Sequence, residues 1–94
     1  MDLTFEWDEE KAIKNLRKHQ ISFHEGTTIF NDPLIATMHD PDHSEGEDRF
    51  ISLGYSSQNR LLVVSYTQRQ DNIRLISCRK ATRKERKKYE ERYI

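Results

Sequence analysis

Three alternating apolar segments between residues 49 and 80 constrain the fold of this chain more than any other feature. They read RFISLGY (49–55), RLLVVSYTQ (60–68) and NIRLISCRK (72–80), and the middle one is rich in the branched and aromatic residues that favour strands. The connections SSQN and QDN are short enough for hairpins. The sequence therefore predicts an antiparallel meander of three strands.

The region before the meander predicts a strand, two helices and a further strand. LTFEW (3–7) alternates apolar and polar residues as strands do, and Asp8 can cap a following helix whose first turn is acidic. A second short helix is expected from Phe23 to Phe30, because Pro33 disfavours helical backbone at the residue before it. LIATMH (34–39) then predicts the strand that precedes the meander.

A capping box marks the start of a closing helix. Thr82 can accept a hydrogen bond from the backbone three residues later and Glu85 can reach back, which predicts a helix over roughly Arg83 to Arg92. The expected element order is β-α-α-β-β-β-β-α. This order predicts one α+β domain over residues 1–94, with a mostly antiparallel sheet, two N-terminal helices and a C-terminal helix.

Positive charge gathers at the end of the chain, although the formal net charge is zero. From Arg74 onward there are nine Lys or Arg and three Asp or Glu, a balance of +6. Residues 1–73 hold seven basic and thirteen acidic side chains, a balance of −6. Such a division predicts a basic contact surface on an otherwise acidic body.

The sequence also indicates a compartment. The single cysteine, Cys78, excludes an intramolecular disulfide and is typical of a reducing environment. No stretch reads as a membrane span or as a signal peptide. We therefore expect a soluble cytoplasmic protein.

Metal and cofactor motifs are not matched. In the acidic loop at 40–48, an EF-hand would need Gly at the sixth position and Glu at the twelfth, where this chain has Glu45 and Ile51. His39 and His43 are accompanied by no zinc-binding pattern, and the three glycines are too scattered for a phosphate-binding loop. We expect no metal ion and no cofactor.

The predicted sheet constrains several arginines. Regular alternation places Arg74 and Lys80 on one face of the last strand and Arg79 on the other. An arginine that faces a core is costly unless it is paired, so Arg74 or Arg79 is expected at a cleft or in an ion pair. In a meander, Arg49 and Arg69 would lie toward the side where the last strand starts, and Arg79 toward the other end.

Lys18 and His19 end the first predicted helix. They are consistent with cations that are favoured by the helix dipole at a C-terminus. They are equally consistent with groups that transfer protons, which histidine commonly does near neutral pH. The sequence leaves both interpretations open.

A set of motifs is spread over nearly the whole chain. They are FEWDEEKAIKNLRKH (5–19), Phe23, FNDP (30–33), Arg49, LGYS (53–56), RLLVVSYTQR (60–69) and IRLISCRKATRKERKKYE (73–90). With these motifs the chain resembles the BrnT family of type II toxin–antitoxin toxins, which are ribonucleases with a RelE-like fold. It departs from the family at Gln68, where an acidic residue is expected, and at Cys78, where alanine is usual. Gln68 leaves open which group pairs with Arg69.

The resemblance implies a RelE-like α+β fold and a metal-independent endoribonuclease that cuts messenger RNA and slows translation. It also implies a cognate BrnA-like antitoxin that blocks the toxin and carries a ribbon-helix-helix DNA-binding segment. The complex would repress its own operon, with the contact to operator DNA made mainly by the antitoxin.

Cleavage of RNA without a metal ion places three demands on an enzyme. When the 2′-hydroxyl attacks its neighbouring phosphate, one proton must be removed, another donated and the more negative phosphorane stabilised. The arginines expected to hold and neutralise the scissile phosphate are Arg49, Arg69 and Arg79. The residues expected to transfer protons are Lys18 and His19. The residues expected to follow the RNA backbone are Lys11, Arg74 and Lys80.

Two other functions are consistent with the basic C-terminal region. A non-catalytic nucleic-acid-binding module would use it for phosphate contacts, with strongly salt-dependent binding and intact RNA. A protein-interaction module would dock its basic helix on an acidic partner and leave RNA unaffected.

Overall fold

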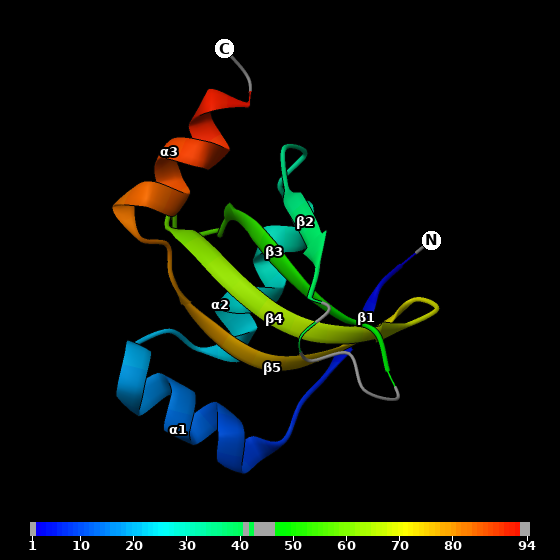
Figure 1. The fold of residues 1–94 in the computed structure, drawn as a ribbon. Helices are drawn as coiled ribbons and strands as arrows, with labels where there is room; N and C mark the ends of the chain where they lie inside the picture. Colours follow the sequence, from blue (N-terminus) through cyan, green and yellow to red (C-terminus); the bar gives the residue numbers. More distant parts are fainter. Residues whose placement is uncertain (1, 41, 43–46, 93–94) are drawn as a thin grey trace.

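A five-stranded sheet in the order β1-β5-β4-β3-β2 is the centre of the fold in a computed structural model of the chain (Figure 1). The structure describes residues 2–40, 42 and 47–92. Its elements are β1 (Thr4–Glu6), α1 (Glu9–His19), α2 (Phe23–Thr27), the 3-10 helix η1 (Thr28–Asn31), β2 (Ala36–His39), β3 (Arg49–Tyr55), β4 (Leu61–Arg69), β5 (Asn72–Lys80) and α3 (Arg83–Glu91). Among the described residues, no helix has the length and apolar character needed to cross a membrane.

The predicted α+β class and element order are confirmed, with one difference in a helix. The helix expected from Phe23 to Phe30 is divided, because α2 ends at Thr27 and a tighter 3-10 turn continues to Asn31. β1 pairs parallel with β5, whereas the pairs β5–β4, β4–β3 and β3–β2 are antiparallel. His43 and Glu45, which were considered for metal motifs, lie outside the described residues.

A bulge in β5 changes the faces that regular alternation predicts. Leu75 pairs with Tyr66 and Ser77 pairs with Ser65, so Ile76 is an extra residue without an opposite partner in β4. One extra residue reverses the alternation beyond it. The prediction that Arg74 and Arg79 face opposite sides of the sheet is therefore wrong.

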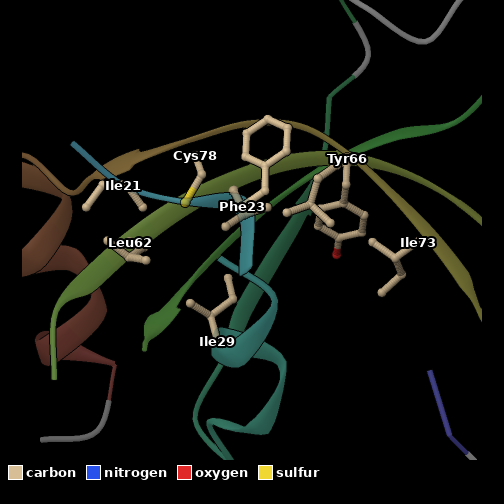
Figure 2. Close-up of a cluster of buried hydrophobic side chains, with 9 residues drawn as sticks. Ile21, Phe23, Ile29, Leu62, Tyr66, Ile73 and Cys78 are labelled. Atoms are coloured by element: carbon tan, nitrogen blue, oxygen red, sulfur yellow. The ribbon is translucent and has the colours of Figure 1, made fainter. Parts of the chain in front are cut away.

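One face of the sheet carries the core and is covered by α2 and η1, while α1 lies along the outer edge of β5 (Figure 1). Figure 2 shows side chains of the α1–α2 connection, α2 and η1 packed against β4 and β5. The buried residues of this cluster are Ile21, Phe23, Ile29, Leu62, Val64, Tyr66, Ile73, Leu75 and Cys78. Burial of apolar surface in this layer stabilises the fold by about 25 cal/mol per Å².

Asn15 attaches α1 to β5. Its side-chain nitrogen donates to the carbonyl oxygens of Cys78 at 2.8 Å and Ile21 at 3.0 Å, and its oxygen accepts from the backbone N–H of Cys78 at 3.1 Å. The pairs of β1 with β5 stop at Arg74. The buried amide of Asn15 therefore takes the place of a neighbouring strand where β1 no longer covers β5.

α3 lies on the opposite side, at the end of the sheet where β5 finishes (Figure 1). The predicted capping box is present, with Thr82 and Glu85 bonded reciprocally. One turn later, the hydroxyl of Tyr89 donates to Asp32 at 2.6 Å and its ring packs edge-on against Tyr55 at 5.6 Å. Asp32 also accepts from the backbone N–H of Tyr55 at 2.8 Å, so the FNDP segment fixes α3 against β3.

Candidate functional site

Three of the predicted arginines lie together on the face of the sheet opposite α1 and α2, which we call the open face. Arg49 of β3 and Arg74 of β5 are both register partners of Thr67 on β4, so these side chains form a row across the sheet. Arg69 lies two residues beyond Thr67 on β4 and therefore points to the same face. We call Arg49, Arg69 and Arg74 the arginine cluster. Its position beside the start of β5 is the one that the sequence predicts.

Carboxylates from neighbouring segments pair with the arginine cluster. Arg74 donates to Glu6 at 3.0 Å, and Arg69 donates to Glu47 at 3.0 Å, which supplies the partner that Gln68 had left open. Both pairs are exposed, and such pairs contribute only about 0–1 kcal/mol each. An incoming phosphate can therefore replace a carboxylate at little cost. A hollow of about 500 Å³ here is lined by Glu6, Glu47, Asp48, Thr67, Gln68, Arg69, Asn72 and Arg74.

Arg79 lies further along the same face and is held by α3. It is the register partner of Val63, about 13 Å from Thr67 along β4 at about 3.3 Å per residue. Its guanidinium donates to both carboxylate oxygens of Glu85, at 2.8 and 2.9 Å. These hydrogen bonds lower the pKa of Glu85 to about 2, against the opposing effect of burial. Arg79 is therefore fixed in orientation and largely neutralised.

A groove of about 720 Å³ runs between α3 and the open face. Its floor consists of apolar side chains of β2, β3 and β4, namely Ala36, Met38, Ile51, Leu53 and Val63. Its other lining residues are Thr37, Arg79, Glu85, Lys88, Tyr89, Glu91 and Arg92. The groove joins an aliphatic surface to a rim of charged groups.

The remaining predicted site residues lie toward the helix-covered face. Lys11, Lys18 and His19 belong to α1, which lies along the outer edge of β5. Lys80 is the register partner of Leu62, a core residue, and so points away from the open face. The structure does not bring these four residues together with the arginine cluster. Their proposed roles in proton transfer and backbone binding stay predictions.

The acidic partners of the arginines were missed by sequence reasoning. Glu6 meets Arg74 because β1 pairs parallel with β5, a contact between residues far apart in the chain. Glu47 reaches Arg69 from the segment before β3. Glu85 was identified as a capping residue, but nothing in its spacing pointed to Arg79. Glu6 and Glu47 are distant in the chain from the arginines they meet, and the pair of Arg79 with Glu85 depends on the turn between β5 and α3.

His39 has a neighbour of its own on the edge of the sheet. Its Nε2 lies 3.3 Å from a carboxylate oxygen of Asp48, and its ring packs edge-on against Phe50 at 5.6 Å. Within residues 2–40, 42 and 47–92, no three His, Cys, Asp or Glu side chains form a group that could hold a metal ion.

Comparison with known proteins gives a family and a fold. Residues 7–85 match the family described as the ribonuclease toxin BrnT of type II toxin–antitoxin systems. The fold is similar to the 1.1 Å crystal structure of the Brucella abortus ribonuclease toxin BrnT, with a TM-score of 0.62 and 19% sequence identity over 86% of this chain and 99% of that one. At this identity the structural likeness supports the fold alone. No curated protein sequence matches the chain.

Proposed function

Because this chain belongs to the BrnT family of ribonuclease toxins of type II toxin–antitoxin systems, we propose that the open face of its sheet binds and cleaves RNA. The observation that carries this proposal is the row formed by Arg49, Thr67 and Arg74, with Arg69 beside it. The paired strands fix the backbone positions from which these three guanidinium groups extend over one face. Such preorganisation is what stabilisation of a developing phosphorane requires.

The proposed reaction uses the 2′-hydroxyl of RNA as the nucleophile. The 2′-oxygen forms a bond to the adjacent phosphorus, and the bond from phosphorus to the 5′-oxygen of the next nucleotide breaks. A base takes the proton of the 2′-hydroxyl, and an acid gives a proton to the departing 5′-oxygen. The products are a 2′,3′-cyclic phosphate and a 5′-hydroxyl. Since DNA lacks the 2′-hydroxyl, it is not a substrate.

The arginine cluster supplies the anion-binding part of this reaction. The planar fork of a guanidinium matches two phosphate oxygens, and three guanidinium groups can offset the extra charge of the phosphorane. Arg69 and Arg74 are already paired with Glu47 and Glu6 in exposed contacts that phosphate can displace. Arg79 lies about 13 Å along β4 and is paired with Glu85, so it would bind RNA only if a phosphate displaced that carboxylate.

Proton transfer in this proposal falls to groups on the open face. Glu6 pairs with Arg74 at 3.0 Å, and a phosphate that displaces it would leave this carboxylate beside the bound anion, where it would take the 2′-hydroxyl proton. Lys18 and His19 would serve as acid and base only if RNA also reached α1. Lys11 and Lys80 would then follow the RNA backbone around the same edge.

The toxin would act on messenger RNA in the cytoplasm and slow translation until an antitoxin binds it. Type II systems pair each toxin with a protein antitoxin, and family membership therefore implies such a partner. We propose a BrnA-like antitoxin with a ribbon-helix-helix segment, which would make most of the contact with operator DNA.

Incubation of the purified chain with end-labelled RNA in EDTA tests this function. We expect cleavage that leaves 2′,3′-cyclic phosphate ends, and no cleavage at a position with a single 2′-deoxynucleotide. Intact RNA with strongly salt-dependent binding would favour a non-catalytic nucleic-acid-binding module instead. Intact RNA without binding would leave a protein-interaction module as the function.

A further inference from the structure

We infer that the groove between α3 and the open face is the docking site for an acidic, amphipathic segment of the cognate antitoxin. The inference deepens the proposed function, since it takes from the family only that an antitoxin is bound. At about 720 Å³ the groove is large enough for several side chains. Burying the apolar face of a helix in a hydrophobic groove is a recurring way of recognising a polypeptide.

The floor of the groove exposes apolar surface to water. Met38 is 64% exposed, the largest value among the large apolar side chains of the described residues. It is the register partner of Ile51, and Leu53 is the partner of Ala36, so these four side chains form one contiguous strip on β2 and β3. Contiguous apolar surface with a charged rim marks a site of protein–protein contact.

The chemistry of the groove favours a polypeptide over RNA. Proteins bind unpaired bases by stacking them on exposed aromatic rings. The floor is aliphatic, and Tyr89, the aromatic residue among those lining the groove, is buried, with its ring packed on Tyr55 and its hydroxyl donated to Asp32. Arg79, which could otherwise bind a phosphate, is neutralised by Glu85.

The charge of the groove wall indicates that the docked segment is acidic. Residues 83–92 contain six Lys or Arg and three Glu, a balance of +3. Lys88 and Arg92 of this stretch line the groove, together with Glu85 and Glu91. Both carboxylates are already engaged, Glu85 with Arg79 at 2.8 Å and Glu91 with Lys87 at 3.9 Å, so the charge that the wall offers to an occupant is positive. A segment with apolar anchors on one side and Asp or Glu on the other would match both surfaces, and its charge would accelerate association.

A segment bound in the groove would also explain how the toxin is blocked. Ile51 lies in the floor of the groove, and Arg49 of the arginine cluster is two residues earlier on the same face of β3, about 7 Å away. An occupant would therefore cover the approach to the arginine cluster from one side. RNA and the antitoxin would compete for the open face.

Binding of purified cognate antitoxin to two variants of the groove tests the inference. Met38→Glu and Met38→Lys both place a charge against the apolar anchor, so each should weaken the complex at least about tenfold. Lys88→Glu should slow association. The matched controls are Ile13→Glu and Lys14→Glu on α1, where Ile13 is 50% exposed, and both should bind like the wild type.

Several results would overturn the inference. Wild-type affinity in both Met38 variants, confirmed as folded by thermal unfolding, would exclude the groove, as would a larger loss in Ile13→Glu. Stronger RNA binding by Met38→Lys together with weaker RNA binding by Met38→Glu would assign the groove to RNA. If the wild type itself cleaves no RNA, the proposed function fails, while the binding data still decide the docking site.

Discussion

Arg79 donates hydrogen bonds to both carboxylate oxygens of Glu85, at 2.8 and 2.9 Å, across the junction of β5 and α3. Glu85 also accepts from the backbone N–H of Thr82 at 2.8 Å, so one side chain closes the capping box and orients the guanidinium. One turn later, Tyr89 attaches α3 to Asp32. The shape of the groove and the orientation of Arg79 therefore depend on the same contacts.

We expect Glu85→Gln to remove an acid-sensitive part of the stability. The pKa of Glu85 is about 2 in the folded state, below its usual value of 4.5, so its contribution is present above about pH 4.5 and is lost as the pH falls toward 2. Because Arg79 is 39% and Glu85 32% exposed, we expect about 1–2 kcal/mol at pH 7 after allowance for solvent screening. In urea unfolding, the difference in free energy of unfolding between the wild type and Glu85→Gln should at pH 3 be less than about half of its value at pH 7.

The control for this pair is Glu90→Gln, which alters an exposed pair with Arg86 at 4.0 Å. It should change the free energy of unfolding by less than about 0.5 kcal/mol at either pH. A loss of stability in Glu85→Gln that is equal at pH 7 and pH 3 would contradict the assigned role of its charge.

Asn15→Ala should destabilise the attachment of α1 to β5. The change removes three hydrogen bonds and leaves the backbone N–H and C=O of Cys78 buried without their partner. We expect a loss of about 2–4 kcal/mol in the free energy of unfolding. Asn31→Ala, at an exposed position of η1, should cost less than about 0.5 kcal/mol. If Asn15→Ala lowered the free energy of unfolding by less than about 1 kcal/mol, on the same order as the control, the prediction would be wrong. Water would then replace the hydrogen bonds of the amide.

Arg60→Met should lower the free energy of unfolding, because it leaves the buried carboxylate of Glu25 without its ion-pair partner. Arg60 bonds to both oxygens of Glu25, and Ser56 donates to Glu25 at 2.7 Å. The hydrogen bonds from Arg60 hold the pKa of Glu25 below its usual value, although burial raises it. Without Arg60, we expect the free energy of unfolding to fall by about 3–5 kcal/mol at pH 7. Burial would then raise the pKa of Glu25 above its unfolded value, so the deficit should narrow as the pH falls from 7 to 5.

Unfolding of the double variant Glu25→Gln with Arg60→Met provides the control for this effect. Because neither Glu25 nor Arg60 carries a charge in the double variant, its free energy of unfolding should be well above that of Arg60→Met. The difference in free energy of unfolding between the double variant and the wild type should not narrow toward pH 5. A deficit in Arg60→Met that stays constant between pH 7 and 5 would mean that Glu25 gains access to water.

Local patterns explain why most of the fold could be predicted from the sequence. The alternation over residues 49–80 and the short connections give the meander, and Thr82 with Glu85 gives the start of α3. The bulge at Ile76 was not predictable, because it arises from the pairing of β5 with β4 rather than from either strand alone. That single residue decides which face Arg79 occupies.

The candidate site was predicted only in part for a similar reason. Arg49 and Arg69 could be placed beside the start of the last strand, because meander geometry relates them. Their acidic partners depend on contacts across the chain, as Glu6 does through the parallel pairing of β1 with β5. The groove likewise depends on the position of α3, which Tyr89 and Asp32 fix. Composition indicated a basic surface but not its shape.

The central claim is that RNA reacts at the arginine cluster on the open face, and cleavage rates of two double variants test it most directly. Arg69→Ala with Arg74→Ala and Lys18→Ala with His19→Ala each remove two basic side chains, on opposite sides of the sheet. With end-labelled RNA in EDTA, we expect the first to lose about 10²-fold or more in rate, as loss of transition-state charge stabilisation does. The second should stay well short of the about 10²-fold loss that removal of a proton-transfer group causes. A large loss in the second variant, with near wild-type cleavage in the first, would contradict the account and assign the chemistry to α1.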